Sequence, residues 1–229
     1  MLPTLRRKYP RTVALSFSRI KDFQTCPKQF HGKHIQKVPQ GTTEAMARGS
    51  AVHKAIENYI KGTTDVKTIP RGAEVAGLID SLRAQGLTIQ AEVGANFTAS
   101  WSPIADKWSK DVWFRQVIDV LGTGKDEAVI LDWKTGKRRF DPKQLQIFAT
   151  GAFLTNPKLE RVTTGFVWLD QIDPPDIVEY GPTVVQETID DIECVADEVE
   201  RSKIRDEWDT RPGQHCRWCP LKGVCPDAE

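Results

Sequence analysis

The sequence predicts a mixed α/β fold, in which a hairpin-rich sheet is flanked by helices. Three observations support this prediction. Residues 16–86 have the apolar spacing of helices, residues 87–133 are rich in the β-branched and aromatic residues of strands, and helical and strand patterns then alternate to residue 205. We therefore expect helices first, then a sheet, and then a helix, further strands and a final helix.

The first three predicted helices come before any strand. The first follows Ser16-Phe-Ser18 and runs from Arg19 until Pro27 stops it. The second covers residues 44–61 and has an apolar stripe. The third covers residues 72–85 and ends at Gly86. The stripe of the second helix consists of Val52, Ile56, Tyr59 and Ile60.

The remaining elements follow from composition and turn signals. Strands are predicted at Leu87–Val93, Trp113–Leu121 and Val129–Trp133, and the last two are joined by a hairpin turn at Gly122–Glu127. Asp141 is expected to cap a helix that begins at Pro142 and ends near Thr155. Two strands, near 161–169 and 176–185, and a helix over about 187–205 complete the order.

The composition is that of an ordinary globular protein of 229 residues, enough for one sizeable core or two small ones. The net charge of +1 excludes a chain that binds nucleic acid through its overall charge, so any grip on phosphates must come from local patches. Neither a secretory signal nor an apolar run of about 18 residues is visible, and we expect a cytoplasmic protein, of a cell or of a phage-infected host. The two basic clusters are Arg6, Arg7, Lys8 and Arg11, which could equally be a solvated surface run, and Lys134, Lys137, Arg138 and Arg139.

Four of the five cysteines predict a metal centre. Cys216, Cys219 and Cys225 form a C-x2-C-x5-C run, which supplies only three thiolates, and Cys26 is the candidate for the fourth. A remote cysteine plus a run of three favours a [4Fe–4S] cluster over a zinc ribbon, as do the prolines that follow three of these cysteines. Zinc stays open as an alternative, because His215 could replace a thiolate. An odd cysteine count without a signal peptide makes a disulfide framework unlikely, and Cys194 faces away from the apolar stripe of its helix.

A carboxylate–lysine cluster predicts hydrolytic chemistry. Asp119 is expected at the end of one strand and Asp132 near the end of the next, so a hairpin can place the two carboxylates side by side. Lys134 lies two residues beyond Asp132 and therefore projects to the same face. Two acids and a lysine suit Mg²⁺-assisted cleavage of a phosphodiester. The alternative is an exposed ion pair at a strand end, which is common for D-x-K, but the buried Ile130-Leu131 before it and the basic turn after it favour a cleft.

His53 is the second contribution to this predicted site. It lies one helical turn after Gly49 on the same face, at the border of the apolar stripe, where a ring nitrogen can face a cleft. The alternative is a buried histidine bonded to a carbonyl.

Together and in this order, these pieces resemble the RecB-family PD-(D/E)XK nucleases, in the branch that carries an iron–sulfur cluster. That branch includes small CRISPR-associated exonucleases and the nuclease domain of AddB-type recombination proteins. The matching segments are Ser16–Phe30 with its C-P-x-x-F, Gly49–His53, Val117–Asp119, Ile130–Lys137 with its D-x-K-T-G-K, Gln144-Leu145, and Cys216–Pro226.

The resemblance implies a restriction-endonuclease-like fold and a single nuclease domain over residues 1–229. Its cluster-binding segments would be about 16–35 and 206–229, joined at the iron–sulfur cluster, and its core about 44–205. The implied roles are Mg²⁺ or Mn²⁺ ligation by His53, Asp119, Asp132 and the Trp133 carbonyl, catalysis by Lys134, and substrate contact or support of the site by Gln144.

Three departures from the family pattern stand out. Phe148 replaces the usual tyrosine, Arg115-Gln116 replaces a glycine, and Glu92 lies where an extra acid sometimes occurs and is given only a weak role. None of them removes a ligand, and we expect an active enzyme.

The resulting hypothesis is a metal-dependent DNA exonuclease that prefers single-stranded ends and serves recombination, repair or DNA processing, CRISPR adaptation included. Trp101, Trp108 and Trp113 could stack bases, although such tryptophans are more often core residues. The alternative is a catalytically silent, cluster-stapled module that binds DNA ends and assists a helicase or another nuclease. Any helicase or recombinase partner would be a separate chain.

Overall fold

The computed structural model describes residues 13–171 and 174–227, so the basic cluster Arg6, Arg7, Lys8 and Arg11 lies outside the described residues. The predicted helices are confirmed, as are the caps expected for the first helix and at Asp141, and a further cap occurs at Thr43. Ser16, Thr43 and Asp141 each accept a backbone N–H at the start of a helix. The helices are α1 Phe17–Thr25, α2 Pro27–Phe30, the π-helix η1 His31–Ile35, α3 Glu44–Ile60, the short η2 Val66–Thr68, α4 Gly72–Ala84, α5 Pro142–Thr155, α6 Val184–Arg205 and the short η3 Gln214–Trp218.

The strands form one mixed sheet in the order β2-β1-β3-β4-β5-β6, which confirms the predicted fold class. β3 and β4 form the predicted antiparallel hairpin, β4 and β5 are parallel because α5 connects them, and β6 is antiparallel to β5. The bounds are β1 Thr88–Phe97, β2 Pro103–Ile104, β3 Phe114–Thr123, β4 Glu127–Lys134, β5 Arg161–Trp168 and β6 Asp176–Tyr180.

Three strand predictions need correction. β1 continues beyond Val93 to Phe97. The strand predicted over 176–185 ends at Tyr180, because Pro182 cannot donate to a ladder and α6 already begins at Val184. Asp119 lies in the middle of β3 and not at its end.

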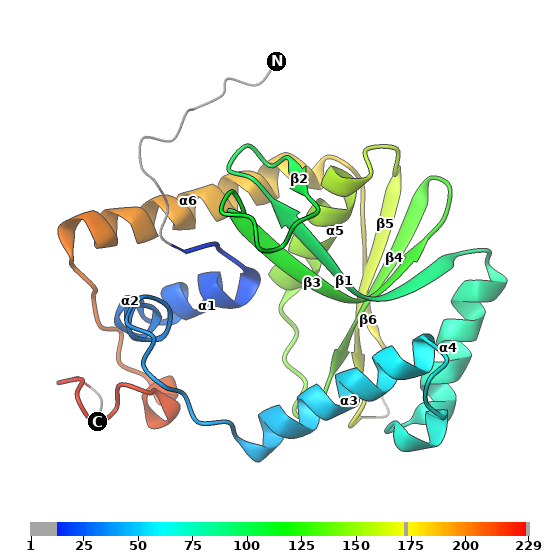
Figure 1. Ribbon diagram of the computed structural model, residues 1–229, viewed down its shortest axis with the longest axis horizontal. Coiled ribbons are helices and arrows are strands. Elements are labelled where there is room, and N and C mark those ends of the chain that lie inside the picture. The colour runs from blue at the N-terminus through cyan, green and yellow to red at the C-terminus, as the bar shows by residue number, and fades with distance from the viewer. Residues whose placement is uncertain (1–12, 172–173, 228–229) are drawn as a thin grey trace. The chain divides into compact units, whose positions relative to one another are not determined.

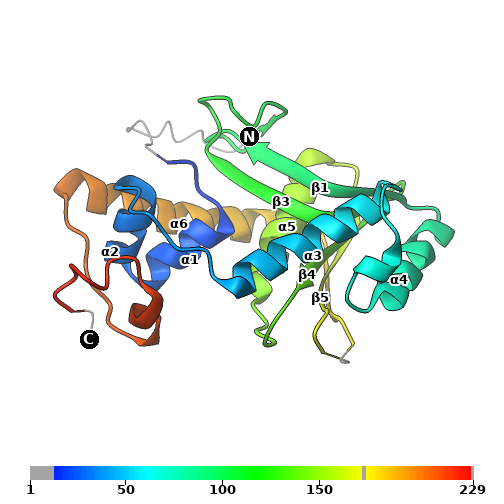
Figure 2. The ribbon, with the colours of Figure 1, turned by 60° about the horizontal axis from the view of Figure 1, so that its bottom comes forward.

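The chain divides into two compact units. The first contains the described residues up to Gly41, Asn96–Arg115 and those from Ile189 onward, and the second contains Thr42–Ala95 and Gln116–Thr188. In the second unit, α3 and α4 lie on one side of the strands and α5 lies on the other (Figures 1 and 2). An apolar cluster around Ile56, Ile79 and Leu131 holds α3 and α4. A second cluster, around Phe148 and Phe166, holds α5. Two helical layers thus fix the strands from both sides.

The first unit brings the two cysteine-containing segments together. The Lys28 N–H donates to the Asp209 carbonyl, and the Arg211 guanidinium donates to the Gln24 carbonyl at 2.7 Å. Gly32 packs so closely on Leu221 that an added Cβ would lie 2.7 Å from that side chain. The N-terminal helices are therefore packed against the C-terminal cysteine segment.

The same unit corrects part of the base-stacking expectation. Trp101 and Trp113 are buried and contact each other edge-on at 4.9 Å between ring centroids, so they belong to a core. The Trp101 indole N–H donates to Glu193. Trp108 is 79% exposed and stays available for stacking.

Candidate active site

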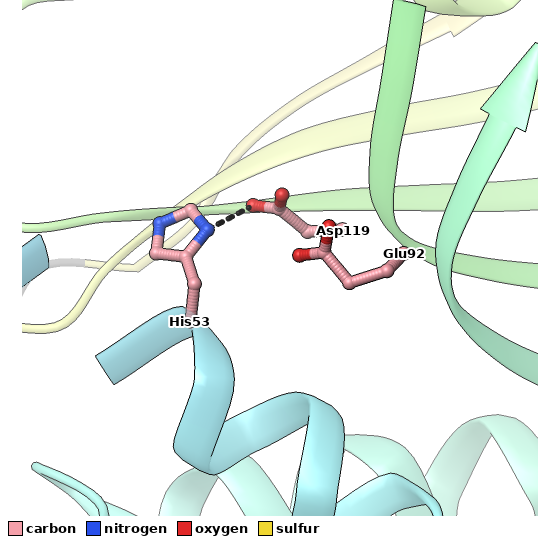
Figure 3. Close-up of side chains that lie close together, drawn as sticks. All are labelled: His53, Glu92 and Asp119. Carbon is pink, nitrogen blue, oxygen red and sulfur yellow. Dashed lines mark ion pairs between the residues drawn. The ribbon is translucent and has the colours of Figure 1, made fainter. Parts of the chain in front are cut away.

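Three side chains from different elements of the second unit form a group that could bind a metal ion. His53 comes from α3, Glu92 from β1 and Asp119 from β3, and one ligand atom of each lies within 4.8 Å of the other two. Figure 3 shows the three side chains converging, with the ion pair between His53 Nδ1 and Asp119 Oδ2 drawn as a dashed line; it measures 3.3 Å. Nitrogen and carboxylate oxygen are ligands that divalent transition metals and Mg²⁺ accept.

Gly49 lies close to the loop that directly follows β4. A Cβ at Gly49 would lie 3.3 Å from Thr135 Oγ1 in this loop, so a side chain there would crowd the Thr135 hydroxyl. Gly49 lies one helical turn before His53, on the same side of α3. The His53 side chain is 31% exposed, so its ring is neither buried in the core nor free in solvent.

Asp119 connects the two central strands. The β3–β4 ladder runs from Thr123 opposite Ala128 to Val120 opposite Leu131. Just beyond this last pair, Asp119 Oδ2 accepts the backbone N–H of Trp133 at 2.9 Å. The Asp119 carboxylate thus replaces a backbone acceptor and is held beside His53. This is why a mid-strand aspartate, and not one at a strand end, reaches the site.

Asp132, Lys134 and Gln144 form a connected network. Lys134 Nζ lies 2.6 Å from Asp132 Oδ2 and donates to Gln144 Oε1 at 3.0 Å. Gln144 Nε2 donates to Asp132 Oδ1 at 3.1 Å. Because Gln144 lies in the first turn of α5, the start of this helix positions both the acid and the lysine. The Lys134 ammonium also lies 4.6 Å from the centre of the Phe166 ring, in the geometry of a cation–π contact.

The acids of the site are crowded. Burial raises the pKa of Asp132 to about 6, the negative charge of Asp119 adds to the rise, and the Lys134 ammonium opposes it. Burial, followed by the charge of Asp119, also raises the pKa of Glu92. The hydrogen bond with Asp119 raises the pKa of His53, although burial acts in the opposite direction. A cation bound among these groups would relieve the repulsion.

The residues present fit such a cation. Asp132 Oδ2 is buried and, apart from its ion-pair contact with Lys134, has no partner in hydrogen-bond geometry within the described chain. An oxygen of this kind is available for a metal. The Trp133 backbone lies beside both His53 and Asp119, where its carbonyl was expected to serve as a ligand.

Glu92 was given only a weak role in the prediction from sequence, but its carboxylate lies with His53 and Asp119. It has φ 54°, a left-handed conformation that is uncommon for a glutamate within a strand. This local conformation accompanies the placement of its carboxylate beside His53 and Asp119. Nothing in the alternation of β1 signals it, and only an acid in a run of otherwise uncharged residues could have drawn attention to it.

The four cysteines Cys26, Cys216, Cys219 and Cys225 line one small cavity of about 20 Å³ in the first unit. Burial raises the pKa of the Cys219 thiol, and the nearness of the other three adds to the rise. Cys216 Sγ accepts the backbone N–H of Gly213 at 3.4 Å, and His215 Nε2 lies 3.9 Å from the same sulfur. Cys194 is exposed on α6 and does not line this cavity.

Among the residues that the structure describes, no helix has the length and apolar character needed to cross a membrane. No match was found among curated protein sequences.

Solved structures resemble the chain at low identity. A candidate exonuclease from Eubacterium rectale has 15% identity and a TM-score of 0.53, with 89% of this chain and 87% of that chain covered. The protein SSO0001 has 13% identity and a TM-score of 0.42, with 96% and 90% covered. LHK-Exo, solved in complex with dAMP, has 14% identity and a TM-score of 0.40, with 82% and 89% covered.

The family model of the PD-(D/E)XK nuclease superfamily matches residues 14–226, which include both the acid–lysine network and the cysteine segments. The chain belongs to the PD-(D/E)XK nuclease superfamily.

Proposed function

We propose that the chain is a DNA exonuclease that depends on Mg²⁺ or Mn²⁺, hydrolyses phosphodiester bonds and prefers single-stranded ends. The observation that carries this proposal is the convergence of His53, Glu92 and Asp119 in the unit that also holds the Asp132–Lys134–Gln144 network. The site is chemically complete for metal-assisted hydrolysis, since it offers ligands, a lysine and a residue that orients the lysine.

The proposed ligands are His53, Asp119, Asp132 and the Trp133 carbonyl, with Glu92 added by the structure. A divalent ion held there supplies a Lewis acid for the phosphate oxygens and lowers the pKa of a bound water. Asp119 and Asp132 repel each other, because burial leaves little water to screen their charges. This repulsion favours binding of a cation between them.

Lys134 is proposed to orient the attacking water through its ammonium group. Its ammonium is held by Asp132 on one side and by the Gln144 carbonyl oxygen on the other, so it has a fixed direction. Gln144 acts as a positioning residue, because its amide spans Asp132 and Lys134. Phe148 of α5, where the family resemblance implies a tyrosine, is buried in an apolar cluster.

DNA as substrate and digestion from ends rest on the superfamily and on the resemblance to small RecB-like exonucleases. The candidate exonuclease from Eubacterium rectale shares the fold. Of the three tryptophans considered for base stacking, Trp108 is the exposed one and supports single-strand preference, and its ring lies 5.2 Å from the Lys107 ammonium.

The test uses end-labelled single- and double-stranded DNA with Mn²⁺, beside Asp119→Ala and Lys134→Ala. Progressive shortening of the labelled strand by the wild type, absent in both variants, is expected. Internal cuts in circular single strands would instead show an endonuclease. Tight binding of DNA ends without hydrolysis would favour the alternative, a silent DNA-end-binding module.

We also propose that Cys26, Cys216, Cys219 and Cys225 bind a [4Fe–4S] cluster within a single nuclease domain. The four thiols line one cavity, which supports a shared metal centre. The choice of a cluster over one zinc ion rests on the pattern of a remote cysteine plus a run of three.

The cofactor is tested by anaerobic purification. The cluster predicts a brown protein with broad visible absorbance and about four irons per chain. Cys219→Ser should lose the colour, whereas Cys194→Ser, the matched control on α6, should keep it. A colourless protein with one zinc per chain would reject the cluster.

A further inference from the structure

A groove of about 350 Å³ adjoins the proposed metal group in the second unit. It is lined by Ser50, His53, Lys54 and Glu57 of α3 and by Glu92 of β1. Two of these residues, His53 and Glu92, belong to the metal group itself. Any substrate bound at the metal therefore meets the side chains of this groove.

One face of α3 continues from the groove as a polar row. Ser50, Lys54, Glu57 and Lys61 are spaced four, three and four residues apart, which places them along one side of the helix. Glu57 pairs with both lysines, at 2.7 Å from Lys54 Nζ and 2.5 Å from Lys61 Nζ. One carboxylate thus faces two ammonium groups, and the row keeps an excess positive charge.

Because Glu57 pairs with two lysines, Lys54 can leave Glu57 and bind another anion. The Glu57 side chain is only 12% exposed, whereas that of Lys54 is 63% exposed. If Lys54 turns toward an anion in the groove, Lys61 still pairs with Glu57, so the Glu57 carboxylate keeps one cationic partner. Ser50 offers a hydroxyl donor one turn earlier on the same side.

We propose that Lys54, helped by Ser50, contacts the backbone phosphate next to the scissile one and guides the DNA strand along α3. This inference rests on the proposed function, because it takes the metal group as the point of cleavage. The chemistry is that of backbone recognition, in which lysine and hydroxyl groups hold phosphates without reading bases. Glu57 is then the resting partner of Lys54, and Lys61 compensates Glu57.

The experiment compares Lys54→Ala with Lys61→Ala, which removes the other partner of Glu57 but does not line the groove. Binding of a labelled single strand of about 20 nucleotides is measured by anisotropy with Ca²⁺ at several salt concentrations. Lys54→Ala should weaken binding about 5- to 10-fold and reduce the salt slope by about 0.7, the amount for one single-strand phosphate contact. Lys61→Ala should stay within about twofold and Lys54→Arg should restore binding, because both keep one cation in the groove.

Kinetics with Mg²⁺ give the second readout. Lys54→Ala should raise KM and leave kcat within about twofold. Equal effects of Lys54→Ala and Lys61→Ala, or a fall in kcat at constant KM, would overturn the inference while a hydrolysing wild type leaves the proposed function intact. A wild type that hydrolyses nothing but shows the Lys54-specific binding loss would reject the nuclease and keep the phosphate contact.

Discussion

The backbone N–H of Trp133 donates a 2.9 Å hydrogen bond to Asp119 Oδ2, just beyond Val120 and Leu131, the last pair of the β3–β4 ladder. The Asp119 side chain therefore accepts the hydrogen bond that a backbone carbonyl would accept in a regular ladder. The same oxygen lies 3.3 Å from His53 Nδ1. The Asp119 carboxylate therefore has two roles, as a hydrogen-bond acceptor in the hairpin and as a proposed metal ligand. Substitutions that keep or remove the acceptor can distinguish the two roles.

Asp119→Asn and Asp119→Ala should differ in stability but not in chemistry. The asparagine oxygen can still accept the Trp133 N–H, so Asp119→Asn should unfold like the wild type. Asp119→Ala leaves that N–H unpaired and should lose about 1–2 kcal/mol in urea unfolding. Both should lose at least about tenfold in Mn²⁺ affinity. Retention of Mn²⁺ affinity in either variant would count against Asp119 as a ligand.

Asp132→Asn should stabilise the metal-free protein at neutral pH. Burial raises the folded pKa of Asp132 from 3.8 to about 6, so the folded state binds the extra proton between these values and its stability falls as pH rises through that window. Asparagine mimics the protonated acid and should gain roughly 1–3 kcal/mol at pH 7, with the difference vanishing near pH 4.

The measurement is urea unfolding in EDTA from pH 4 to 8. Saturating Mn²⁺ should reverse the order at pH 7, because only the wild type gains stability from the ion. A difference between the proteins that does not change with pH would contradict the argument.

Glu92 should show a trade-off between metal binding and stability. Its left-handed backbone at φ 54° suits glycine, so Glu92→Gly should keep or raise the free energy of unfolding by about 0.5–1 kcal/mol. The same variant should bind Mn²⁺ about tenfold more weakly, as should Glu92→Gln. Glu74 is an exposed acid on α4, and Glu74→Gln is the control for the loss of one negative charge away from the site. Unchanged Mn²⁺ affinity in both Glu92 variants would remove it from the ligand set.

Gly151 and Gln116 should be energetically coupled. A Cβ on Gly151 would lie 1.9 Å from Gln116 Nε2, and the Gln116 amide is buried. Gly151→Ala should therefore cost about 1–3 kcal/mol despite the higher helix propensity of alanine. Gly77→Ala in α4, where nothing lies within 4 Å, should instead gain about 0.5–1 kcal/mol. The double variant Gln116→Ala with Gly151→Ala should recover most of the loss, and simple additivity of the two changes would refute the clash.

Local patterns in the sequence determined most of the secondary structure. The stripe of α3, the proline at the start of α5 and the turn between β3 and β4 each follow from a few neighbouring residues, and all three were predicted at nearly the observed positions. The pairing of Asp132 with Lys134 also followed from the two-residue period of a strand. Contacts within one element or one hairpin are readable because their geometry repeats.

The tertiary structure alone decided the rest. Asp119 was expected at a strand end, Glu92 was given little weight, and Trp101 and Trp113 were offered as base-stacking residues, although they are buried. These positions depend on where a ladder stops and on which distant strands and helices meet. Contacts between residues far apart in the chain leave no periodic pattern in the sequence. The sequence therefore indicated the acids, the histidine and the lysine as candidates, and packing determined which of them share a site.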